Sequence, residues 1–188
     1  MIAIESFRKY KIKDLIAIFI LVGIWALFSS IGEKYFGGEY AYYFSLLLAS
    51  IMVSLGILLM RKFGAAVLIY LMGGIFGYAI PELGVVGLEK IYVLLIAGII
   101  FELAFLILRI ELKDIQIDIA LGSALSAASI PLSTSILLSW KIALSMLTSM
   151  INLVLASFFI GLMGAVISFM LWSKLRNKKF ILRFEYGA

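Results

Sequence analysis

One acidic residue lies inside a long apolar run. Residues 91–109 read IYVLLIAGIIFELAFLILR, and Glu102 is flanked there by Phe101 and Leu103. Placing an ionisable group inside a bilayer costs free energy. Such an acid therefore suggests a function, and a partner for it must be identified. Glu102 either contacts a ligand or forms a structural or gating bond to another helix.

The depth of Glu102 favours the structural role. At 1.5 Å per residue it lies about 15 Å farther along a helix than Tyr92, and therefore nearer to Arg109. A ligand arriving from the Tyr92 side would meet that tyrosine long before the carboxylate. Tyr70 and Asn152 are the expected partners of Glu102, because both lie well inside neighbouring apolar runs.

A second group of residues with useful chemistry lies in or beside the connections between apolar runs. It combines carboxylates with aromatic rings: Glu33, Glu39, Glu82 and Glu89, with Tyr35, Phe36, Tyr40, Tyr42, Tyr43, Phe44, Tyr78, Tyr92 and Trp140. Most of these rings fit an aromatic belt at a membrane interface. The opposite ends of the second to fifth runs are poor in Trp and Tyr, and this asymmetry favours an aromatic pocket. Such rings beside a carboxylate suit a flat, cationic ligand, at about 0.5–2 kcal/mol per contact.

The composition of the chain identifies its class. Of 188 residues 64% are hydrophobic and 14% are charged, and the mean hydropathy is +1.17. A soluble domain has roughly a quarter charged residues, so this is an integral membrane protein. Its length allows one domain, 1–188, with roughly six crossings. The chain has no cysteine and no histidine, which excludes disulfides, thiolate or imidazole metal sites and nucleophiles that depend on either residue.

The apolar runs predict an all-α bundle of six transmembrane helices. They fall at about 14–31, 40–60, 63–80, 91–108, 115–132 and 148–172, followed by a basic tail at 173–188. No small-residue cleavage site follows the first run, so it is interpreted as a retained helix. The segment 131–147, PLSTSILLSWKIALSML, fits either a loop with a short surface helix or an extension of the sixth helix.

The positive charges predict the orientation. All but three of the 16 lysines and arginines fall at the termini or in the even-numbered connections; the exceptions are Lys34, Lys90 and Lys141. By the positive-inside rule both termini are therefore cytoplasmic, in the plasma membrane of a prokaryote. The net charge of +5 is explained by this topology and by contact with anionic lipid head groups, and it does not indicate binding to nucleic acid.

Small residues mark where helices can approach one another. Gly161-x-x-x-Ala165 and Gly164-x-x-x-Ser168 lie in the sixth run, and residues 122–129 in the fifth run read GSALSAAS. Small residues four apart let two backbones touch inside a membrane. These faces either pack within the bundle or form a docking face for a partner membrane protein, and packing is the simpler interpretation.

The order of these features resembles the substrate-binding S components of energy-coupling factor (ECF) vitamin transporters, in particular the YkoE-like group for thiamin and hydroxymethylpyrimidine. The shared marks are LLMRKFGAAVLIYLMGGIFGYAI, an acidic outer loop with GVVGLEK, and the run that holds Glu102. The first helix, KIKDLIAIFILVGIWALF, is also similar, and the resemblance covers residues 10–175. The Ala-x-x-x-Ala docking face that many S components carry on this helix is absent here, where Ala17, Gly23 and Ala26 have other spacings.

The resemblance implies a binding subunit that is not an enzyme and needs no cofactor. Such a subunit captures a vitamin-like small molecule and docks to an ECF scaffold membrane protein that carries two cytoplasmic ATPases. Candidate substrate-binding residues, from depth, chemistry and the family's pattern, are Trp25, Tyr43, Tyr70, Tyr78, Glu82, Glu102, Trp140 and Asn152. Of these, Glu82, Trp140 and Asn152 match the positions of family site residues by location alone.

Two other classes of function remain open. The first is a self-sufficient small transporter or channel, or a structural membrane protein, which an inverted repeat would support; the two halves show no convincing match. The second is a membrane enzyme that processes lipids. Its acids would be Glu111, Asp114 and Asp118, but a helix start explains them more simply, since acids favour an N-terminus.

Overall fold

The computed structural model describes residues 10–81, 83–108, 111–112, 115–138 and 144–176. Within them it confirms the predicted all-helical bundle of six helices. These are α1 (Ile12–Tyr35), α2 (Gly38–Met60), α3 (Ala65–Phe76), α4 (Gly87–Leu108), α5 (Ile117–Leu138) and α6 (Leu144–Leu175). Between α4 and α5, β1 (Glu111–Leu112) and β2 (Ile115–Gln116) form a short antiparallel ladder that the hydropathy pattern did not indicate.

Five of the six helices, all except α3, are long and apolar enough to cross a membrane. Helix α3 has 12 residues, or about 18 Å, whereas the hydrocarbon core of a bilayer is about 30 Å thick. It occupies only part of the predicted range 63–80. Gly64 has a positive φ of 84° just before it, and glycines at its far end weaken the helix there.

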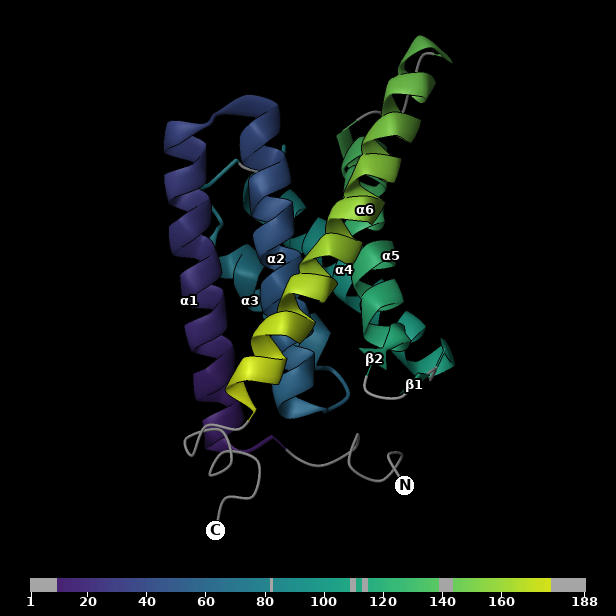
Figure 1. Ribbon diagram of the computed structural model, residues 1–188. Helices are drawn as coiled ribbons and strands as arrows, with labels where there is room; N and C mark the ends of the chain where they lie inside the picture. Colours follow the sequence, from purple (N-terminus) through teal and green to yellow (C-terminus); the bar gives the residue numbers. More distant parts are fainter. Residues whose placement is uncertain (1–9, 82, 109–110, 113–114, 139–143, 177–188) are drawn as a thin grey trace.

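The two ends of the bundle differ in charge. The described chain termini and the α2–α3 turn lie at one end, and the α1–α2 connection lies at the other (Figure 1). We call the first the basic end, after Lys11, Lys13, Arg61, Lys62, Lys174 and Arg176, and the second the acidic end, after Glu33, Glu39 and Glu89. In the predicted orientation the acidic end faces outward.

The most extensive contacts join α4 with α5, α5 with α6, α2 with α6, and α3 with α4. Helix α6 crosses the bundle obliquely in Figure 1. A Cβ at Gly161 would lie 2.6 Å from the carbonyl oxygen of Ser123, so only glycine permits this approach of α6 to α5. The small residues found in the sequence therefore pack within the bundle.

Helix α5 continues beyond the predicted end at 132. Pro131 lies inside it, and the helix ends at Leu138. Proline lacks the N–H that would bond to the carbonyl oxygen of residue 127. One turn later, Ser135 Oγ donates to the Pro131 carbonyl oxygen at 2.7 Å. Helix α6 begins at Leu144, so the last part of the segment 131–147 belongs to the sixth helix, and residues 139–143 lie outside the described chain.

Candidate functional site

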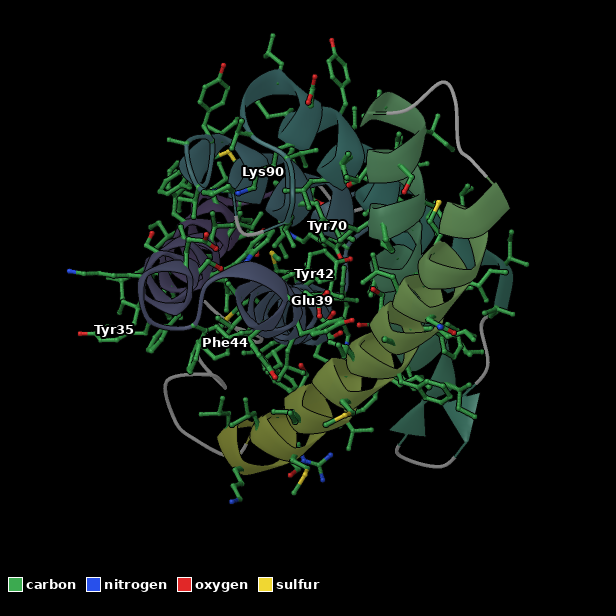
Figure 2. All side chains as sticks on the ribbon, turned by 90° about the horizontal axis from the view of Figure 1, so that it is seen from above. Tyr35, Glu39, Tyr42, Phe44, Tyr70 and Lys90 are labelled. Carbon is green, nitrogen blue, oxygen red and sulfur yellow. The ribbon has the colours of Figure 1, made fainter. Side chains whose placement is uncertain are left out.

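A hollow of about 400 Å³ opens at the acidic end of the bundle. Its described lining residues come from the α1–α2 corner, the loop after α3, and α6: Glu33, Gly38, Glu39, Tyr42, Tyr43, Pro81, Gly84 and Leu153. A volume of this size fits a small heteroaromatic molecule, since ligand sites typically measure about 300–1,000 Å³. In Figure 2, which looks down on this end, Glu39 and Tyr42 lie near the middle of the bundle and Tyr35 points away from it.

The hollow combines negative charge with aromatic faces. Glu33 lies in the last turns of α1, and Glu39 lies in the first turn of α2, where the positive end of the helix dipole favours a carboxylate. The Tyr42 and Tyr43 rings are 5.4 Å apart in a T-shaped pair. The hydroxyl of Tyr42 lies 3.2 Å from Ser157 Oγ on α6, which fixes that ring against the opposite wall. This chemistry favours a cation with a flat ring.

Among the sequence candidates that the structure describes, Tyr43 is the one that lines this hollow. Tyr78 and Asn152 are exposed and are not among its described lining residues. Glu82 and Trp140 lie outside the described residues. The sequence had singled out Glu33, Glu39 and Tyr42 as part of the acidic, aromatic group, but nothing in a single sequence distinguished them from an interfacial belt.

Trp25 and Tyr70 are core residues. They are 2% and 1% exposed, and their rings meet edge to face at 6.2 Å. The Trp25 ring lies against Gly73 on α3, because a Cβ there would fall 1.8 Å from a ring carbon. Trp25 Nε1 donates to Ser45 Oγ at 3.4 Å, and the Tyr70 hydroxyl lies 3.0 Å from Ser126 Oγ. These bonds satisfy both polar atoms within the bundle.

Glu102 binds the start of α3. Its Oε1 atom accepts a hydrogen bond from the backbone N–H of Ala66 at 2.9 Å, and the side chain is buried. The first N–H groups of a helix have no partner within it, and a carboxylate there also complements the helix dipole. The observed partner of Glu102 is thus the backbone of α3. Tyr70 bonds to Ser126 instead, and Asn152 is exposed.

Lys90 binds the opposite end of α3. It is 0% exposed, and its ammonium donates to the carbonyl oxygens of Gly77 at 2.6 Å and Ile80 at 2.9 Å. The last carbonyl groups of a helix lack partners within it, and a cation there complements the dipole. In the sequence, Lys90 resembles an ordinary loop lysine at a membrane interface, and nothing in the sequence indicated that it would be buried.

A buried pair of opposite charges lies at the basic end. Lys62, in the α2–α3 turn, forms an ion pair with Asp14 in the first turn of α1. The hydroxyl of Tyr10 donates to the Phe63 carbonyl oxygen at 2.7 Å. Burial raises the pKa of the Tyr10 hydroxyl well above its usual range, and the carboxylates of Glu102 and Asp14 raise it further. Tyr10 therefore stays protonated, and can donate, at high pH.

No protein-family model, curated protein or solved structure matches this chain.

Proposed function

We propose that this protein is a membrane substrate-binding subunit of an ECF-type transporter. In this proposal the hollow at the acidic end captures a vitamin or vitamin precursor of the thiamin or hydroxymethylpyrimidine class. A scaffold membrane protein and two cytoplasmic ATPases then supply the energy for uptake. The chain itself binds and releases the ligand and catalyses no reaction.

The observation that carries the proposal is the lining of the hollow. Glu33 and Glu39 bring two carboxylates to a cavity that Tyr42 and Tyr43 line with aromatic surface. Thiamin offers a cationic ring and an aminopyrimidine, so it matches both features. The fold is compatible with this role, because it provides five helices suited to crossing a membrane and a loop that closes one side of the hollow.

Binding to the purified protein tests the proposal directly. Wild-type protein in detergent is titrated with thiamin, with hydroxymethylpyrimidine as the neutral relative and with choline as a cation that lacks an aromatic ring. Thiamin is expected to bind best. The double variant Glu33→Gln, Glu39→Gln should lose roughly tenfold in thiamin affinity, ~1.4 kcal/mol, because both charges that face the cation are gone.

Glu89→Gln is the matched control. Glu89 is an exposed carboxylate in the first turn of α4 at the same end of the bundle, but it is not among the described lining residues. This variant should keep wild-type affinity. Equal losses in both variants would show that a diffuse surface charge attracts the ligand, and no binding of either vitamin compound would reject the proposal.

Uptake into sealed vesicles separates this subunit from a self-sufficient carrier. The chain alone is expected to bind thiamin without accumulating it. Accumulation should require ATP and the partner proteins. Robust uptake by the chain alone would favour an independent transporter.

A further inference from the structure

The loop that joins α3 to α4, residues 77–86, forms one wall of the hollow. Pro81 and Gly84 from this loop line the cavity. Backbone hydrogen bonds shape its described part: Ile80 N–H donates to the Gly77 carbonyl oxygen at 3.0 Å, and Gly84 N–H to the Pro81 and Gly87 N–H to the Tyr78 carbonyl oxygen, both at 2.8 Å. These bonds set the local turns of the loop, and contacts with the bundle are needed to fix its position against the hollow.

Two apolar side chains anchor this loop to the bundle. Leu83 is 1% exposed and Val85 is 3% exposed, although both belong to a connection between helices. Gly84, between them, is exposed and has a positive φ of 77°, so the backbone turns outward there towards the hollow. Apolar burial is non-directional, however, and does not by itself set the position of the backbone.

Lys90 supplies directional contacts to the same loop. Its ammonium donates to the carbonyl oxygens of Gly77 and Ile80, which are the first residue of the loop and the residue just before Pro81. A buried cation requires such partners, and bonds to a charged group are stronger than neutral ones. Because Lys90 is fully buried on α4, it holds the loop from inside the bundle (Figure 2).

Lys90 is not among the described residues that line the hollow. Figure 2 shows it apart from Glu39 and Tyr42, on the side where the loop after α3 lies. We infer that Lys90 is a positioning residue of the binding site: it fixes the 77–86 loop, and thereby the shape of the hollow, without touching the ligand. This inference rests on the function proposed above.

Lys90→Met tests the inference, with Lys34→Met as the matched control. Methionine keeps most of the length of the side chain and removes the ammonium. Lys34 is an exposed lysine near the same end of the bundle. The first measurement needs no ligand: hydrogen exchange of the hydrogen-bonded Gly84 and Gly87 amides should become about tenfold faster in Lys90→Met and stay unchanged in Lys34→Met.

The second measurement is thiamin affinity, together with Tm. Lys90→Met should bind thiamin about tenfold more weakly, because the loop, no longer held by the ammonium, must be ordered when the ligand binds. This loss of affinity should be measurable at temperatures far below the Tm of the variant. Lys34→Met should bind as the wild type does. A role in stability alone would lower Tm and leave affinity unchanged, and that outcome would overturn the inference, as would unchanged exchange in the loop.

The two proposals fail in different ways. A wild-type protein that binds neither thiamin nor hydroxymethylpyrimidine rejects the proposed function, and with it a positioning role for that ligand. Wild-type binding combined with an unaffected Lys90→Met variant rejects only the inference about Lys90. If Lys90→Met does not fold, Lys90→Arg replaces it under the same criteria, since arginine keeps the charge but moves the donors away from the two carbonyls.

Discussion

The two ends of α3 are held by opposite charges from the same neighbour. Lys90 and Glu102 lie twelve residues apart on α4, about 18 Å at 1.5 Å per residue, which matches the length of the 12-residue α3. The carboxylate binds the N-terminal end of α3 and the ammonium binds its C-terminal end. Both charges therefore complement the dipole of a helix that is too short to cross a membrane.

The two contacts differ in what they hold. Glu102 binds regular helix at Ala66, deep in the bundle and next to the cytoplasmic turn of the predicted topology. Lys90 binds the place where the helix gives way to a loop, and this loop lines the hollow. We therefore expect Glu102 to govern stability and Lys90 to govern binding.

The largest expected effect is the loss of the Glu102 carboxylate. Glu102→Leu leaves the Ala66 N–H without an acceptor in an apolar environment and should lower the free energy of unfolding by about 3 kcal/mol. Glu102→Gln keeps an acceptor oxygen for the Ala66 N–H and loses the charge, so its cost should be about 1 kcal/mol. Unfolding by heat or denaturant in detergent measures both.

Thiamin affinity serves as the control measurement for the Glu102 variants. The hollow lies at the other end of the bundle, so Glu102→Gln should keep wild-type affinity for thiamin. A strong loss of affinity in Glu102→Gln, with Tm unchanged, would place the ligand at the basic end and reverse the contrast between Glu102 and Lys90.

The second prediction concerns the ion pair at the basic end. Asp14→Asn leaves the buried ammonium of Lys62 without its counter-charge, and should destabilise the protein by about 2 kcal/mol. Lys62→Met should cost a similar amount, and the double variant should cost less than the two single changes together. Additive losses would show that the two side chains stabilise the fold independently.

The sequence predicted the membrane-type helical bundle because the apolar runs report burial in lipid or protein without any knowledge of contacts. It also singled out Glu102, since a carboxylate in an apolar run is an anomaly that can be seen from composition alone. Its partner could not be predicted, because a backbone N–H carries no sequence signal. Lys90 went unnoticed for the converse reason: a lysine beside a loop is ordinary until the fold buries it.

The aromatic residues show a second limit of the sequence. By residue type and position in the sequence, Trp25 and Tyr43 are equally good candidates for lining a pocket. Tyr43 lines the hollow, while Trp25 fills a space that exists only because residue 73 on another helix is glycine. Whether a ring faces a ligand or the core depends on such pairings between distant segments, which one sequence does not reveal.

The smallest expected effect concerns Tyr10, which lies just before α1 and joins it to the turn before α3. Tyr10→Phe removes the hydrogen bond to the Phe63 carbonyl oxygen and should cost about 1 kcal/mol at neutral pH. Because burial raises the pKa of Tyr10, the folded protein holds this proton more tightly than the unfolded chain, whose tyrosine pKa is about 10.

The contribution of Tyr10 is therefore complete below pH ~10 and declines as the pH rises above that value, because the unfolded chain then loses the proton first. The wild type should lose more stability than Tyr10→Phe between about pH 9 and 11, and the difference in Tm between them should shrink. All other titrating groups are common to both proteins, so they cancel in the comparison. A constant difference in Tm across this range would mean that the folded state holds the Tyr10 proton no more tightly than the unfolded chain does. The basic end of the bundle would then be more open to water than its buried charges indicate.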